Sequence, residues 1–85
     1  MKIQISSGSC CLYFNEGPYS GKAIRLDGER VSKGFLFNIK PMDWIVRESN
    51  GLDHVHSIND EEKEALIAYI TEEGLKQDYK FTLWK

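Results

Sequence analysis

The sequence predicts an α+β domain in which one amphipathic helix packs against an antiparallel β-sheet of about five strands. Apolar and polar residues alternate through the first half of the chain and again near position 80, a pattern typical of strands with one buried face. Between these regions, residues 60–73 have the spacing of an amphipathic helix. The 85 residues are expected to form a single domain, 1–85, because a second core would need roughly as many residues again.

Turn motifs separate the strands expected in the first half. We expect strands at 2–6, 10–15, 22–26, 35–39 and 42–47. Asp27-Gly28 is a strong hairpin signal because both residues tolerate positive φ. Pro41 is expected to interrupt the pairing, so that 42–47 forms a separate short strand or an irregular edge.

The helix has clear start and stop signals. Asn59 is a good N-cap, and Glu62 completes the spacing of a capping box. The apolar residues that share one sector of the helix are Leu66, Ile67 and Ile70. Gly74 suits the left-handed position just beyond a helix end, which predicts that the helix stops at residue 73. A final strand, 79–84, is expected to pair inside the sheet.

Several features favour a cytoplasmic protein. The longest uncharged stretch, residues 3–15, has 13 residues and is only partly apolar, whereas a membrane span needs about 20. The N-terminal residues predict a strand and not a secretion signal. Cys10 and Cys11 are adjacent and would enclose no loop, so we expect reduced structural thiols, with a vicinal redox switch as the alternative.

Acidic residues are concentrated in one part of the chain. Residues 1–42 have a net charge of +3, residues 43–78 of −7 and residues 79–85 of +2. The middle segment contains ten acidic and three basic residues. Nucleic acid is therefore not the expected partner, since phosphate binding needs clustered Lys and Arg. A basic protein partner is compatible with this distribution.

No pattern in the sequence predicts catalysis, a cofactor or a metal site. His54 and His56 have the i, i+2 spacing that two ligands on a strand can have, but a structural metal site needs four ligands and no second pair is present. We interpret them as exposed residues of a polar loop before the helix. Ser57 is adjacent to His56, which is a poor acid–base couple without a third positioned group. No glycine spacing fits a phosphate-binding loop.

The face of the helix opposite its apolar sector is more informative. It carries Glu61, Glu64, Ala65, Ala68 and Glu72. Small alanines between glutamates form a flat acidic surface that a basic partner could approach closely, although a simple solvated helix face has the same composition. Trp44 and Trp84 are residues of the type that anchor interfaces, and for Trp44 a position in the core is an equal alternative.

The order of several short segments resembles a known family. These segments are GKAIRLDGE (21–29), Gly34-Phe35, Trp44, INDEEKEALI (58–67) and EGLKQDYKF (73–81). Together they resemble small bacterial immunity proteins associated with polymorphic toxin and contact-dependent inhibition systems. The loop after the tryptophan lacks the diproline of that family, and if this loop is the recognition element, the toxin partner is expected to differ.

The resemblance implies a cytosolic inhibitor that binds and neutralises a cognate toxin domain, commonly a basic nuclease. The residues expected to contact the toxin are Trp44, Glu48, Asp53, Glu61, Glu64 and Glu72. The alternative is a small accessory or ligand-binding domain unrelated to toxins, which a conspicuous pocket lined by the second sheet face would favour. The sequence leaves the oligomeric state open.

Overall fold

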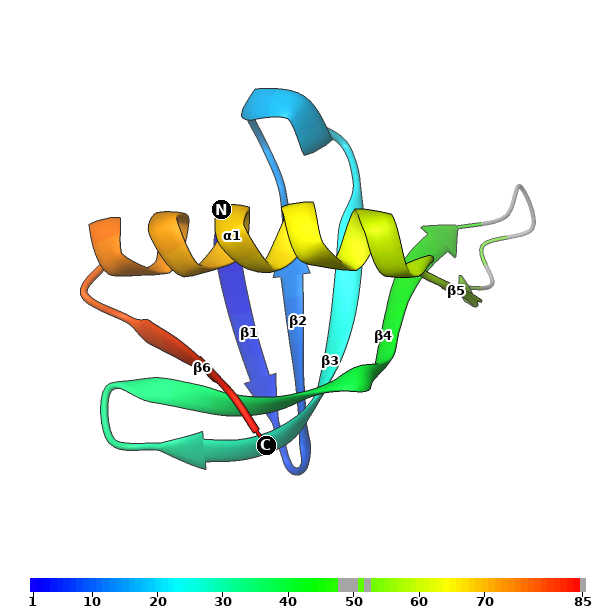
Figure 1. The fold of residues 1–85 in the computed structure, drawn as a ribbon. Helices are drawn as coiled ribbons and strands as arrows, with labels where there is room; N and C mark the ends of the chain where they lie inside the picture. The colour runs from blue at the N-terminus through cyan, green and yellow to red at the C-terminus, as the bar shows by residue number, and fades with distance from the viewer. Residues whose placement is uncertain (48–50, 52, 85) are drawn as a thin grey trace.

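The computed structural model describes residues 1–47, 51 and 53–84, which form a bent sheet crossed by one helix (Figure 1). The elements are β1 (Lys2–Ser6), β2 (Ser9–Tyr13), the 3-10 helix η1 (Gly17–Tyr19), β3 (Ala23–Val31), β4 (Gly34–Arg47), β5 (Asp53–Ser57), α1 (Asp60–Lys76) and β6 (Lys80–Leu83). The predicted α+β fold with its helix in the C-terminal half is confirmed. The sequence also predicts a turn at Ser49-Asn50-Gly51, and of these three only Gly51 is among the described residues.

Five strands follow one another in an antiparallel order, β1-β2-β3-β4-β5. The last strand, β6, joins the first half of β4 in parallel, with Phe81 opposite Phe35. A parallel pair needs a crossover connection, and in this chain the crossover from the sheet back to β4 includes α1. The helix therefore lies across one face of the sheet (Figure 1).

The hairpin between β3 and β4 differs from the prediction. Asp27 and Gly28 lie within β3, and the chain turns instead at Ser32-Lys33, where Lys33 has a φ of 57°. The glycine serves a different purpose, because a Cβ at Gly28 would clash with the backbone carbonyl oxygen of Leu36 on β4. The turn signal was wrong because this glycine allows two strands to approach closely.

Pro41 lies where the pairing of β4 with β3 is interrupted, as predicted, since no residue between Asn38 and Asp43 is paired with β3. The strand itself nevertheless continues through Pro41. Arg25 of β3 pairs with Asp43 of β4, but two residues later Asp27 pairs with Asn38. Extra residues of β4 are thus accommodated in an irregularity of the ladder, and there the strand bends sharply (Figure 1). Proline, which cannot donate a ladder hydrogen bond, is tolerated at such a position. Residues 42–47 are therefore not a separate strand.

The start of α1 is as predicted. The Asn59 side chain accepts a hydrogen bond of 2.8 Å from the backbone N–H of Glu62, and its amide donates to the Glu62 carboxylate at 2.7 Å. This cap supplies a partner for one of the N–H groups that a helix leaves unpaired at its first turn.

The end of α1 was predicted three residues too early. The helix includes Gly74 and ends at Lys76, and the residue with a left-handed backbone is Asp78, at a φ of 59°. Gly74 is buried, and a Cβ there would lie 2.6 Å from the carbonyl oxygen of Tyr79 and 2.7 Å from the ring of Phe81. The glycine therefore allows β6 to pass close to the helix, and it does not mark the helix end.

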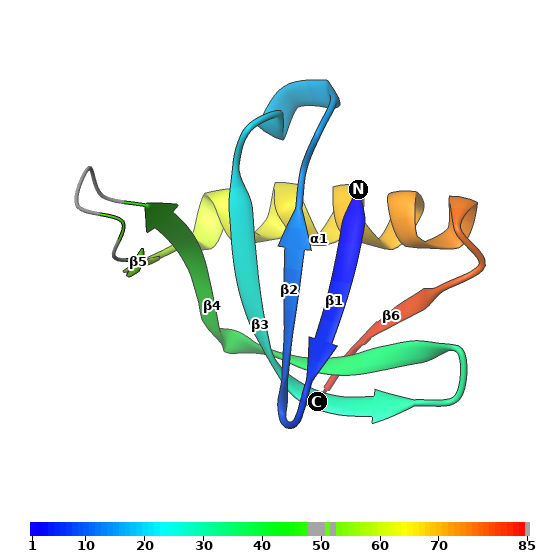
Figure 2. The same ribbon diagram turned by 180° about the vertical axis from the view of Figure 1, so that it is seen from behind.

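One hydrophobic core fills the space between α1 and the inner face of the sheet. Its buried members are Cys10, Leu12, Phe14, Ile24, Leu26, Phe35, Phe37, Met42, Ile58, Leu66, Ile70 and Phe81. The alternation predicted for the strands and the apolar sector of the helix account for most of them. Figure 2 shows the molecule from behind, where none of the described helices covers the sheet. In the described part of the chain, no helix is long and apolar enough to cross a membrane.

Candidate partner-binding surface

The outer face of α1 carries the predicted acidic surface. We call this surface the acidic stripe, and it consists of Glu61, Glu64, Ala65, Ala68 and Glu72. All five residues are exposed, and their spacing places them along one side of the helix. The stripe is directed away from the sheet, because Leu66 and Ile70 on the opposite side are fully buried.

The two lysines of α1 do not neutralise the acidic stripe. The Lys63 ammonium donates a 3.0 Å hydrogen bond to the carbonyl of Lys40, which draws it towards the sheet. Lys76 forms a 2.7 Å ion pair with Glu73, and this hydrogen bond raises the pKa of the Lys76 ammonium. Within the described part of the chain, the carboxylates of Glu61, Glu64 and Glu72 form no ion pair. The stripe therefore presents three carboxylates that form no ion pair, of which Glu72 also interacts electrostatically with Lys76, four residues along the helix.

Four aromatic side chains gather beside the helix, and we call them the aromatic cluster. They are Phe14, Tyr19, Trp44 and Tyr69. The ring of Tyr19 lies at the centre, with its centroid 5.2 Å from that of Tyr69, 5.6 Å from that of Phe14 and 6.1 Å from that of Trp44. Separations of 4.5–7 Å are those of interacting aromatic pairs. The cluster holds the β2–β3 connection against α1.

Trp44 combines the two roles that the sequence left open. It is opposite Ile24, on the face of the sheet that packs against α1, and it is partly buried against the core. The ammonium of Lys22 lies 5.1 Å from the centroid of its ring, within the range of a cation–π interaction. A hollow of about 600 Å³ opens beside it, lined by Gly21, Lys22, Trp44, Ile45, Val46 and His56. Trp44 therefore packs against the core and also lines a hollow at the surface.

Tyr69 connects the aromatic cluster with the acidic stripe. It follows Ala65 by four residues and precedes Glu72 by three, and residues at these spacings are neighbours on a helix. Its hydroxyl donates to the carbonyl of Glu16 at 3.4 Å. Burial, followed by the carboxylates of Glu73 and Glu16, raises the pKa of its phenol. Acidic and aromatic residues therefore form one continuous surface, from the middle of α1 to Trp44.

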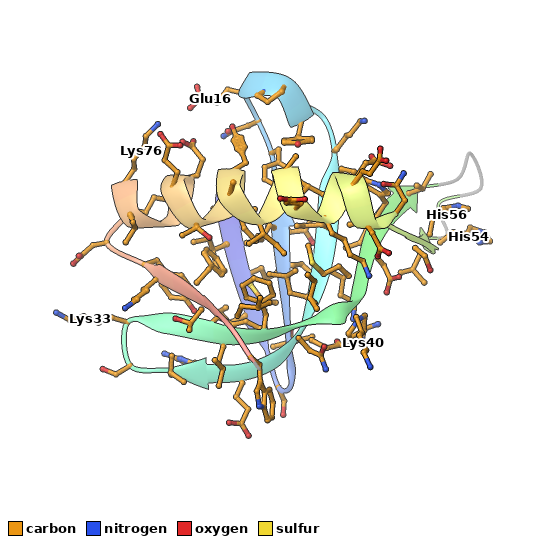
Figure 3. All side chains as sticks on the ribbon, in the orientation of Figure 1. Glu16, Lys33, Lys40, His54, His56 and Lys76 are labelled. Atoms are coloured by element: carbon orange, nitrogen blue, oxygen red, sulfur yellow. The ribbon has the colours of Figure 1, made fainter. Side chains whose placement is uncertain are left out.

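His54 and His56 lie in β5 and not in the loop that we predicted. Both are exposed, and Figure 3 shows them at the outer edge of the sheet, at the opposite end of the molecule from Lys76. Their side chains share the face that carries Val46 and Trp44, which are their partners on β4. Among the described residues, no group of three or more His, Cys, Asp or Glu side chains could hold a metal ion.

The other chemical groups of the sequence are kept apart by the sheet. Ser57 pairs with Asp43 and His56 with Trp44, and neighbouring residues of a strand point to opposite faces. Ser57 and His56 therefore do not form an acid–base couple. The thiols are separated in the same way. Cys10 is fully buried and Cys11 is partly exposed on the uncovered face, and both are reduced.

The structure brings together four of the six residues predicted to contact a partner. Glu61, Glu64 and Glu72 lie on the acidic stripe, and Trp44 joins them through Tyr19 and Tyr69. The other two predicted residues are described only in part or not at all. Asp53 is the first residue of β5 and not a loop residue, paired with Arg47 through the backbone, and Glu48 lies outside the described residues.

Sequence reasoning missed Tyr19, Tyr69 and Lys22 as members of this surface. Tyr69 is not part of the apolar sector predicted for the helix, and Tyr19 and Lys22 lie in and beside the run of turn residues Gly17, Pro18, Ser20 and Gly21. Their importance depends on the folding of the β2–β3 connection over α1, which no local pattern encodes. Comparison with family models, curated proteins and solved structures found no match for this chain.

Proposed function

We propose that this chain is a cytoplasmic immunity protein that binds a cognate bacterial toxin domain and neutralises it by protein–protein interaction. The observation that carries the proposal is the acidic stripe, whose three carboxylates form no ion pair within the described part of the chain. The resemblance of residues 21–85 to immunity proteins gives the partner its class. A basic nuclease is the kind of toxin that this surface fits best.

The acidic stripe suits fast association. Charges of one sign attract an oppositely charged protein over about a Debye length, roughly 8 Å at physiological ionic strength, and raise the association rate. Ala65 and Ala68 lie between the glutamates and let a partner approach the helix closely. Trp44, Tyr19 and Tyr69 then supply apolar contact area of the kind that slows dissociation.

Neutralisation follows from competition for the same charges. A nuclease must present Lys and Arg side chains to the phosphates of its substrate. A row of carboxylates at positions 61, 64 and 72 can pair with those side chains and thereby exclude nucleic acid. No chemical step by the inhibitor is needed in this mechanism.

Charge reversal tests the proposal, with a candidate toxin domain encoded by a neighbouring gene as the partner. The variant carrying Glu61→Lys, Glu64→Lys and Glu72→Lys is expected to associate about tenfold more slowly, or slower still, at low salt, and the difference should shrink as salt is added. Stopped-flow or surface plasmon resonance measurements give the rates. Glu64→Lys alone has a matched control in Glu29→Lys, which makes the same change of charge at an exposed glutamate on β3.

Two results would contradict the proposal. Equal, salt-independent association of the triple variant and the parent chain would remove the acidic stripe from the interface. Failure of the parent chain to protect cells that express the neighbouring toxin domain would overturn the function itself.

The hollow beside Trp44 favours a second candidate, a small ligand-binding domain. Lys22, Trp44 and His56 could together hold a small aromatic anion, through charge and ring stacking. The uncovered face of the sheet has a smaller hollow, of about 460 Å³, which is lined in part by Tyr13 and Ile45 and gives weaker support to the same candidate. Binding of such an anion that is lost in Lys22→Ala, without any toxin binding, would favour this candidate.

A further inference from the structure

β5 is an edge strand of the sheet. It pairs with β4 on one side, and both ribbon views place no other described strand beyond it (Figures 1 and 2). An edge strand presents backbone N–H and C=O groups that can pair with another chain. The register of the ladder determines which residues of β5 direct these groups outwards.

Two hydrogen bonds fix that direction. The N–H of Ile58 donates to the carbonyl of Met42, so residues 42 and 58 face each other as a hydrogen-bonded pair. Hydrogen-bonded and non-hydrogen-bonded pairs alternate in an antiparallel ladder, which makes the pairs 44–56 and 46–54 hydrogen-bonded. A second hydrogen bond leads to the same result, because the N–H of Phe14 donates to the carbonyl of Lys22. Residues 14 and 22 are therefore a hydrogen-bonded pair, so 13–23 is not, 23–45 is, and 45–55 is not. The residues of β5 with outward backbone groups are therefore 53, 55 and 57.

The uncovered face of the sheet carries an apolar row that ends at this edge. The row runs across four strands through the directly paired residues Tyr13, Ala23, Ile45 and Val55. Val55 is 54% exposed, the largest value for any large apolar residue described in the sheet strands, and Tyr13 at the start of the row is 39% exposed. A strand added beside β5 would cover the side of Val55 and continue the row.

We propose that β5 pairs with β5 of a second copy of this chain, antiparallel and about a two-fold axis at Val55. Val55 would then face Val55 of the other copy. Residue 53 of each copy would face residue 57 of the other, which makes three pairs in all. All three pairs use the outward groups derived above, which gives about six hydrogen bonds at two for each pair. The two sheets become one continuous sheet, and the apolar row becomes twice as long.

The sequence of β5 favours its own copy as the partner. Asp-His-Val-His-Ser is nearly symmetric about Val55, so each histidine position meets the other histidine position, and Asp53 meets Ser57 and not a second acidic residue. Edge strands are commonly protected from pairing by lysine, proline or bulges. The edges β1 and β6 contain Lys2 and Lys80, whereas β5 contains no lysine, proline or glycine. This proposal does not depend on the toxin-binding function.

The test is the molar mass of the chain alone, by sedimentation equilibrium from micromolar to submillimolar concentrations. We expect the mass to rise from 9.8 kDa towards twice that value. Val55→Lys places two like charges opposite each other and should raise the dissociation constant about tenfold or more. Val31→Lys is the matched control, because Val31 is also an exposed strand valine, at 41%, and it should leave the mass curve unchanged.

Val55→Pro tests the backbone contribution separately. The N–H that it removes points away from β4, so the fold should tolerate the change, which circular dichroism verifies, while the dimer loses its central pair of bonds. A chain that stays monomeric at every concentration would overturn the proposal. A dimer that survives both Val55→Lys and Val55→Pro would overturn it too, since it would use another surface.

Discussion

The two faces of the sheet differ more than their sequences suggest, and the adjacent cysteines illustrate the difference. Cys10 lies on the face covered by α1, and burial, together with the neighbouring Cys11, raises the pKa of its thiol to about 12. Cys11, one residue later, lies on the uncovered face and is partly exposed. On one face apolar residues are buried to stabilise the fold. On the other, apolar residues stay accessible in a row from Tyr13 to Val55.

The sharpest way to test this contrast is thiol alkylation. With Cys11→Ala and Cys10→Ala as single-thiol chains, iodoacetamide at pH 8 should modify Cys11 about a thousandfold faster than Cys10, or more. The reason is that the buried thiol carries almost no thiolate and reacts only after unfolding, which costs about 5 kcal/mol or more. Mass spectrometry follows the modification. Similar rates for the two chains would mean that the covered face opens easily.

Truncation of one aromatic residue on each face gives the next largest effect. Phe37→Ala should lower the free energy of unfolding by about 3–5 kcal/mol, because it leaves a cavity where a fully buried ring contacts Phe81. Tyr13→Ala on the uncovered face should cost less than about 1 kcal/mol. Urea denaturation measures both values. Comparable losses at the two positions would show that the uncovered face also contributes a core.

Gly74→Ala separates helix propensity from packing, with a smaller effect. Propensity alone predicts that the free energy of unfolding rises by about 1 kcal/mol. The added Cβ, however, would meet the carbonyl oxygen of Tyr79 and the ring of Phe81 on β6, which predicts that it falls by about 1–3 kcal/mol. Denaturant unfolding decides the sign. Ala65→Gly on the exposed side of α1 is the matched control and should lose about 1 kcal/mol from propensity alone. A stabilised Gly74→Ala variant would show that β6 packs loosely on the helix.

The elements that could be predicted are those encoded by local patterns. Alternation predicted β1, β2 and the buried face of β3. The helix cap could be predicted because the two residues that form it, Asn59 and Glu62, are only three positions apart. The acidic stripe was also predictable, since helical spacing fixes which residues of α1 share a side. Local patterns therefore located three of the surface residues that carry the proposed function.

The wrong predictions of the hairpin and of the helix end share a physical cause. Glycine occurs both where the backbone turns and where another segment passes too closely for a Cβ. Gly28 and Gly74 were interpreted as turn and stop signals, but each is placed where another strand passes too closely for a Cβ. The actual left-handed positions are occupied by Lys33 and Asp78, residue types that give no such signal. Close approach depends on a strand far away in the sequence, so it could not be read locally. The clustering of Tyr19 and Tyr69 beside Trp44 was missed for the same reason.

The parallel pairing of β6 has a consequence for the order of folding. Its contact between Phe35 and Phe81 joins residues 46 positions apart. Consecutive strands from β1 to β5 are separated by two to nine residues, and such short loops close at a smaller entropic cost. Long-range contacts form slowly because the chain must lose its freedom before the contact stabilises it. We therefore expect the antiparallel meander to form first, with α1 and β6 closing over its apolar face in the last step and separating first when the protein opens.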